Sequence, residues 1–269
     1  QDAIKELAPT MAKVSAERIQ VELVKLLTSD HPEMMRNLYE LGLTKVFMPE
    51  FDTMMETPQN NKHHMYSVGE HTIRTLMNVR ADKVLRLTML LHDVAKPVCI
   101  TTDEEGQNHF KKHPAVGADM AKQILRRLKF DNKTIDCCCR LVKEHDDRPQ
   151  ITPKNVRRAM SRIGAGLFPM LFEVKRADML GQSLYKRKEK MAYIDEFERV
   201  YNEILSDDQC VSKKDMKING RDLIDLGMEP GQKLGEILDK LYEMVLDDPE
   251  LNDHEKLIEH ANKIISTLI

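Results

Sequence analysis

The stretch VLRLTMLLHDVAKP, residues 84–97, decides the fold. Its apolar residues run almost without interruption to Val94, and Pro97 stops the helix that they predict. The dipeptide His92-Asp93 stands at the end of this helix. A carboxylate on a buried helix face is costly unless it is paired or bound to a metal. The stretch therefore predicts a buried helix that carries a polar site.

The segments on either side have helical spacing as well. Ser67, followed by Glu70 three positions later, predicts a helix start that places His71 in the first turns. Residues 98–112 read as a polar loop, and residues 167–203 as one long helix whose apolar face carries Asp178. No alternating strand pattern of useful length appears, so the sequence predicts an all-α protein.

Composition fits a folded globular protein rather than a disordered chain. The 269 residues include 41 Lys+Arg and 44 Asp+Glu, for a net charge of −3, and 41% are hydrophobic. No apolar run is long enough to span a membrane, and the first residues read as helix rather than signal peptide. The chain has five cysteines, an odd number, and no CxxC motif, which argues against a disulfide framework or a zinc ribbon. We therefore expect reduced thiols in a cytoplasmic protein.

Charge is distributed unevenly along the chain. Residues 111–190 hold 20 Lys+Arg against 9 Asp+Glu, a local excess of +11, whereas the remaining residues sum to −14. A basic middle third is what a site for an anionic ligand needs. Solvated helix faces explain the same excess equally well.

Three separate predicted helices each direct a metal-ligand type of side chain inward. These are His92-Asp93, then His145 on the apolar face of the helix that Asn132 opens, and Asp178. The simplest common explanation is a metal in the core of a helical bundle. Imidazole and carboxylate together suit Mn, Fe, Co, Ni or Zn better than Ca or Mg. The alternative is a set of buried His–Asp ion pairs without metal.

The order of these residues resembles a known signature. The series His71, His92-Asp93 and Asp178 is similar to the H…HD…D pattern of the HD superfamily of metal-dependent phosphohydrolases, which are all-α bundles. The resemblance is closest in residues 90–97, where Ala95 replaces the usual Gly. It implies one or two divalent ions, with Mg also admitted and Asp93 as the bridge. The implied ligands are His71, His92, Asp93 and Asp178 for the first ion, and Asp93, His113 and His145 for the second.

A narrower resemblance extends over essentially all of residues 1–269. TPQNN at 57–61, SVGEHT at 67–72, HFKKH at 109–113 and INGRDL at 218–223 look like the HD-containing body and tail of bacterial tRNA nucleotidyltransferases, the CCA-adding and poly(A) polymerase family. The Gly-Gly motif and paired carboxylates of that family's nucleotidyltransferase head are missing. We expect a part of a longer enzyme or a free-standing descendant. The expected divisions are a neck-like helical segment at 1–58, an HD domain at 59–190 and a helical tail at 191–269.

These resemblances imply a metal-dependent phosphohydrolase that acts on nucleotide or RNA-end phosphoesters. Its substrates would be 2′,3′-cyclic phosphates, 2′-nucleotides or phosphomonoesters. Asp93 would hold the attacking hydroxide between the metals, and Lys96 would neutralise phosphate charge, unless it is only a lysine at a helix C-terminus. Four further residues are candidate substrate contacts: His64, His109, Lys112 and Arg148.

Two other functions remain open. The first alternative is a tRNA-binding body of a CCA-adding enzyme whose HD metal site is vestigial. The second is a metal-stabilised bundle without catalysis. The expected partners are a nucleotide or RNA end, and tRNA, with no membrane.

Overall fold

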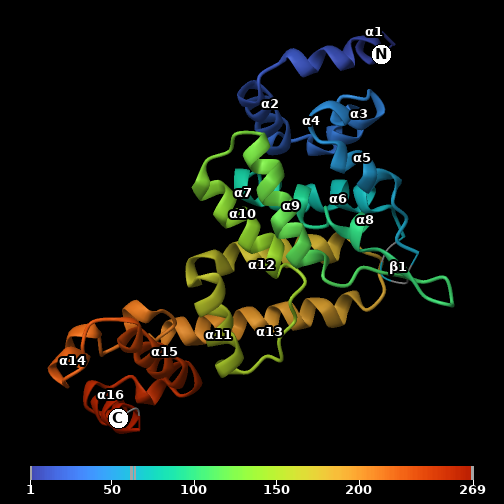
Figure 1. The fold of residues 1–269 in the computed structure, drawn as a ribbon. Coiled ribbons are helices and arrows are strands. Elements are labelled where there is room, and N and C mark those ends of the chain that lie inside the picture. Colours follow the sequence, from blue (N-terminus) through green and yellow to red (C-terminus); the bar gives the residue numbers. More distant parts are fainter. Residues whose placement is uncertain (1, 61–62, 64, 268–269) are drawn as a thin grey trace. The chain divides into compact units, whose positions relative to one another are not determined.

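The computed structural model of the protein describes residues 2–60, 63 and 65–267 (Figure 1). Helices make up nearly all of its regular structure, so the prediction of an all-α protein is confirmed. Within the described residues, no helix combines the length and the apolar character needed to cross a membrane. The chain divides into two compact units, each of which is described by itself.

The first unit comprises Gln1–Asp147 and Pro169–Ile194. Its elements before residue 148, with η for a 3-10 helix, are α1 (Asp2–Leu7), η1 (Ala8–Lys13), α2 (Ala16–Thr28), η2 (Pro32–Met34), α3 (Met35–Glu40), α4 (Thr44–Phe47), α5 (Pro49–Glu56), α6 (Val68–Leu76), α7 (Lys83–Leu91), α8 (Lys96–Cys99), β1 (Thr101–Thr102), β2 (Asn108–His109), α9 (His113–Arg127) and α10 (Asn132–Glu144).

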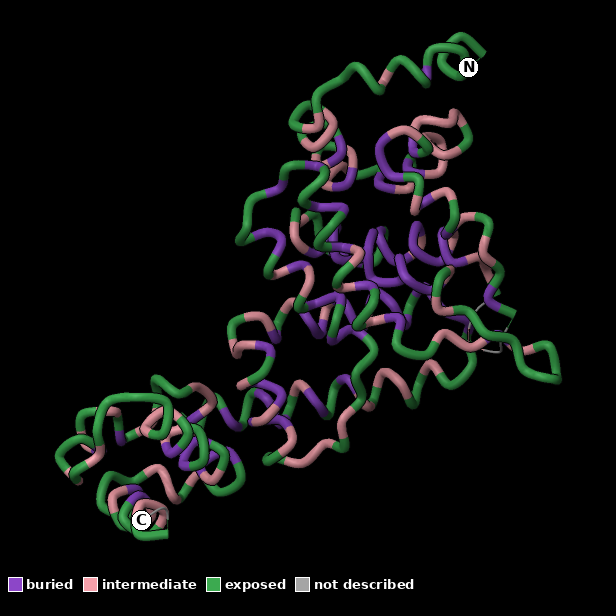
Figure 2. Tube along the Cα trace, viewed as in Figure 1, coloured by how far each residue is buried: buried purple, intermediate pink, exposed green. Residues whose placement is uncertain are grey.

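Local sequence explains where the helices around the site begin. The side chains of Ser67, Asp82 and Asp131 each accept a hydrogen bond from a backbone N–H in the first turn of α6, α7 and α10. Helix α10 packs against α7 and α9, and α6 packs against α5 and α7. Figure 2 shows that buried residues concentrate on these central helices, whereas α1 is almost entirely exposed.

One short sheet interrupts the predicted polar loop at 98–112. β1 pairs antiparallel with β2, with Thr101 opposite His109 and Thr102 opposite Asn108. The Asp103 carboxylate accepts hydrogen bonds from the backbone N–H groups of Glu105 and Gln107 and so closes the turn between the strands. The strands have two residues each, which is too short to give a sequence pattern.

The prediction of one long helix over residues 167–203 is wrong. The structure has two helices there, α12 (Phe168–Gly181) and α13 (Arg187–Ser206). Arg187 Nη2 donates to the carbonyl oxygens of Leu180 and Gln182, at 3.2 and 2.9 Å, and thereby satisfies carbonyls at the end of α12. Lys186 has a φ of 54°, a left-handed conformation that a continuous helix excludes.

The second unit comprises Arg148–Phe168 and Asp195–Ile269. Helix α15 (Gln232–Asp247) contacts α11, α14 and α16. Buried apolar side chains, among them Leu223, Leu241 and Leu257, form its own core. The other elements of this unit are α11 (Pro153–Ile163), η3 (Ala165–Leu167), η4 (Lys213–Asp215), α14 (Gly220–Asp225), η5 (Pro249–Leu251) and α16 (His254–Ser266).

Candidate metal centre

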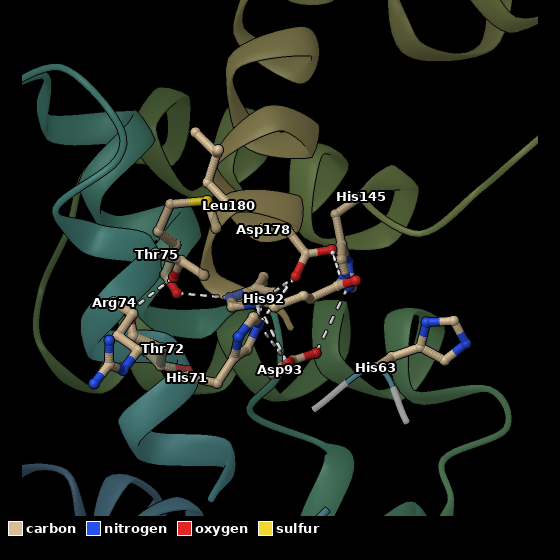
Figure 3. A network of polar contacts seen from close by, with 12 residues as sticks. His63, His71, Thr72, Arg74, Thr75, His92, Asp93, His145, Asp178 and Leu180 are labelled. Carbon is tan, nitrogen blue, oxygen red and sulfur yellow. Dashed lines mark hydrogen bonds and ion pairs between the residues drawn. The ribbon is translucent and has the colours of Figure 1, made fainter. Parts of the chain in front are cut away.

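A group of buried imidazole and carboxylate side chains lies in the first unit (Figure 3). His71 comes from α6, His92 from the end of α7 and Asp178 from α12. One ligand atom from each of the three lies within 4.8 Å of the others. His71 Nε2 is 2.9 Å from Asp178 Oδ1 and 3.3 Å from His92 Nε2. This is the first ligand set.

A second ligand set, Asp93, His113 and His145, meets the same 4.8 Å limit. The Asp93 carboxylate faces both sets, because Oδ2 lies 3.2 Å from His92 Nε2 and Oδ1 lies 3.3 Å from His113 Nε2. The structure thus brings together all six residues that the sequence singled out as ligands. Each of the six is at most 8% exposed.

Three of the histidines are oriented in the same way. The Nδ1 atoms of His92, His113 and His145 each lie 2.6–2.8 Å from the backbone carbonyl oxygen of the residue three positions earlier. Such a bond requires a proton on Nδ1, which leaves the Nε2 lone pair of a neutral ring directed into the cluster. Metal-ligating histidines are held in this manner.

The cluster consequently gathers electron pairs that repel one another. The Nε2 atoms of His113 and His145 lie 3.3 Å apart, and the nearest oxygens belong to carboxylates. Burial lowers the pKa of His92, but the charge of Asp93 and a hydrogen bond with Asp178 outweigh it and raise this pKa to about 10. The two carboxylates and the inward-facing ring nitrogens therefore favour a positive charge in the cluster. The nitrogen and oxygen donors present fit a divalent transition metal.

Lys96 is buried and paired inside the cluster. Its Nζ lies 2.7 Å from Asp93 Oδ2 and donates to Gln59 Oε1 at 2.9 Å. Burial raises the pKa of the Asp93 carboxyl, but the positive charges of His92 and Lys96 hold it well below its usual range. Lys96 therefore neutralises the carboxylate that lies between the two ligand sets.

Sequence reasoning missed two residues that support the ligands. Lys175 Nζ donates to the carbonyl oxygens of Glu144, His145 and Asp147, at 3.2, 2.9 and 2.6 Å, and so satisfies the end of α10. Gln182 Nε2 donates to Asp178 Oδ2 at 3.0 Å. Both lie three or four positions from Asp178, and this helical spacing was the available signal.

The four candidate substrate contacts lie differently. His109 is in β2, where its Nε2 is 2.7 Å from Asp103 Oδ2. Lys112 is exposed and precedes α9 with a φ of 67°, and Arg148 is exposed at the start of the second unit. His64 lies outside the described residues. Neither the exposed Lys112 nor the exposed Arg148 lies in the buried cluster.

Two protein-family models match the chain. The model described as "Probable RNA and SrmB-binding site of polymerase A" matches residues 1–55. The model of tRNA nucleotidyltransferase domain 2 matches residues 113–261, more than half of the chain.

Individual relatives agree with these models. The CC-adding tRNA nucleotidyltransferase of Thermus thermophilus is 30% identical over 234 residues, which cover 84% of this chain and 52% of that protein. The A-adding enzyme of Deinococcus radiodurans is 31% identical over 237 residues, which cover 84% and 54%. The chain thus spans about half the length of these curated relatives. The crystal structure of the Bacillus stearothermophilus CCA-adding enzyme with CTP matches 99% of this chain and 56% of that chain, with a TM-score of 0.61 at 19% identity, and supports the fold.

The expectation of a metal-dependent phosphohydrolase is wrong. The relatives that cover most of the chain are nucleotidyltransferases, which are transferases rather than hydrolases. The resemblance of the H…HD…D series misled because it reports a ligand arrangement, and a ligand arrangement does not fix the reaction.

Proposed function

The chain belongs to the family of tRNA nucleotidyltransferase domain 2, and from this premise we propose that it is the RNA-binding body of a tRNA nucleotidyltransferase. One observation carries the proposal. Residues 113–261, which match the tRNA nucleotidyltransferase model, include nearly all of the basic stretch at 111–190. That stretch contains 20 Lys+Arg and 9 Asp+Glu. Positive charge supplies most of the affinity of a protein for a nucleic-acid backbone.

The turn between α9 and α10 is the best candidate for the RNA contact. We define the basic hairpin as four exposed residues of this turn and of the two packed helices beside it: Lys122 and Arg126 of α9, Lys129 in the turn, and Lys133 of α10. None of the four has an ion pair within the part of the chain that the structure describes. Gln20 of α2 donates to the Lys129 carbonyl oxygen at 3.1 Å, so the segment that matches the RNA-binding model touches this turn.

Binding of a fluorescent tRNA as a function of salt concentration tests the proposal. Changing all four basic-hairpin residues to Gln should weaken binding by at least about tenfold and reduce the slope of log K against log salt by up to about 0.9 per lost phosphate contact. The matched control changes four exposed lysines of the acidic tail, Lys233, Lys240, Lys256 and Lys263, to Gln. The proposal fails if the unmodified chain does not bind tRNA at low salt, or if both quadruple variants bind equally well.

We further propose that the six-residue cluster is an HD-type metal centre that stabilises the bundle. The first ion would be held by His71, His92, Asp93 and Asp178, and the second by Asp93, His113 and His145. These ligands come from α6, the end of α7, α9, the end of α10 and α12, so a bound ion ties together helices distant in sequence. Mn, Fe, Co, Ni or Zn suits the donors, and Mg is admitted. The readout is metal retained after dialysis.

A further inference from the structure

A hollow of about 350 Å³ lies in the first unit, beside the candidate metal centre. Its walls come from Met65 and Tyr66, from the end of α6, and from residues 180–187. Gly181 lines the hollow and also lies against the cluster. A Cβ on Gly181 would lie 2.6 Å from Thr75 Cγ2 and 3.2 Å from His71 Nδ1. Figure 3 shows Arg74 and Leu180 on one side of the clustered histidines and His145 on the other.

The charge of this pocket is positive. Arg74 and Arg187 line it, and no acidic side chain does so in the described part of the chain. Glu70 lies outside the lining, with its Oε1 3.4 Å from Arg74 Nε, and it shares its charge with Arg36. The Arg74 guanidinium stacks over the Tyr66 ring, with 3.9 Å between its carbon and the ring centroid, and is thereby held in a fixed orientation. The Nε atom of Arg187 is buried and has no hydrogen-bond partner among the described residues. An anionic group such as a phosphate or a carboxylate is the ligand that arginine guanidinium groups recognise.

The other walls suit a flat apolar body. Met65 and Leu184 are 73% and 76% exposed, an unusual condition for large apolar side chains that flank one hollow. The Asn78 side chain adds an amide that can pair with a ring edge. Single-stranded RNA is recognised by stacking of its bases on aromatic, apolar and guanidinium surfaces, together with charge contacts to phosphate.

We propose that the pocket binds one nucleoside monophosphate unit, as an unpaired nucleotide of an RNA strand. The phosphate lies against Arg74 and Arg187, and the base lies between Tyr66 and Leu184. The volume is within the range of small-ligand sites. The identification of the strand as RNA rests on the proposed function. The pocket itself is argued only from its own residues.

Equilibrium binding of AMP and CMP to the whole chain tests this, with adenosine and inorganic phosphate as partial ligands. Both nucleotides should bind, and each partial ligand should bind more weakly. Leu184→Glu places a negative charge on an exposed wall, and Arg74→Met keeps the packing on Tyr66 but removes the charge. Each should weaken nucleotide binding by about tenfold or more. Leu205→Glu, a similar change at an exposed leucine of the second unit, should leave it unchanged.

A single-stranded RNA hexamer should displace a fluorescent AMP from the pocket. Failure of the hexamer to compete, while AMP binds, overturns the assignment to an RNA strand. The pocket is overturned if AMP and CMP do not bind, if inorganic phosphate binds as tightly as they do, or if both pocket variants retain full affinity. The same samples are tested for tRNA binding. Loss of nucleotide binding with tRNA binding intact rejects the pocket alone, whereas failure of tRNA binding rejects the proposed function.

Discussion

The Nε2 atoms of His113 and His145 face each other at 3.3 Å, while the Nδ1 atom of each ring lies against a carbonyl oxygen of its own chain segment. Two lone pairs at this distance are stable only with a cation between them or beside them. The Nε2 atoms of His71 and His92 also lie 3.3 Å apart, with the Asp178 carboxylate beside them. The cluster thus has two places that call for positive charge.

We expect the chain to retain divalent transition metal after dialysis and to melt at a higher temperature with metal than without it. A ligand present at 1,000 times its Kd stabilises the folded state by about 4 kcal/mol. Elemental analysis and calorimetry measure both effects. His113→Ala should lower the metal content by removing the second ion, and His92→Ala should remove the first. His109→Ala, at a half-buried histidine outside the cluster, is the control, and equal metal in all three variants would refute the two-site arrangement.

Gly181→Ala should destabilise the first unit. The added Cβ would lie 2.6 Å from Thr75 Cγ2 and 3.2 Å from the His71 ring, so α12 and α6 must separate, at a cost of about 1–3 kcal/mol. Gly235→Ala is the matched control, since nothing lies within 4 Å of its Cβ and a helical Ala is favoured by up to about 1 kcal/mol. Urea unfolding measures both changes, and a stabilised Gly181→Ala would contradict the close approach.

Lys175→Met should loosen the end of α10. Removing the ammonium leaves three carbonyl oxygens of residues 144–147 without this donor, for a loss of about 1–3 kcal/mol. Hydrogen exchange should accelerate around His145 before it does elsewhere in α10. Lys143→Met, an exposed lysine of the same helix, should leave exchange unchanged. Similar exchange in both variants would argue against the capping role.

Asp131→Ala tests the helix start of α10 as a function of pH. Hydrogen bonds from the Thr134 side chain and backbone lower the pKa of the Asp131 carboxyl, although it is exposed. Because the folded pKa is lowered, its stabilising effect is present above the unfolded pKa and is lost as pH falls below about 4. The variant should be less stable by about 1 kcal/mol at neutral pH, and the difference should shrink in acid. Asp136→Ala should cost less than about 0.5 kcal/mol.

The position of the site was predictable because its ligands follow helical spacing. His92-Asp93 ends the most apolar helix, and Asp178 shares the apolar face of α12. Ionisable side chains therefore occur at positions that the sequence predicts to be buried, and these positions belong to the site. To predict that these side chains meet, it was enough to assume that the helices pack into one bundle.

The break between α12 and α13 was not predictable in the same way. It depends on the approach of Gly181 to α6, about a hundred positions earlier in the chain, and on the capping of α12 by Arg187. The reaction was not predictable either, because the ligands alone do not tell whether substrate reaches the metal.

The order of the two ligand sets along the chain determines which set is complete first during synthesis of the chain. Asp93, His113 and His145 span 53 consecutive residues, so their ligand set is complete in the nascent polypeptide once α10 has left the ribosome. The set of His71, His92 and Asp178 needs 33 residues more. A cation captured by the earlier set would hold α7, α9 and α10 together while α12 is still being translated. The pair of sites would then fill in the order in which the message is read.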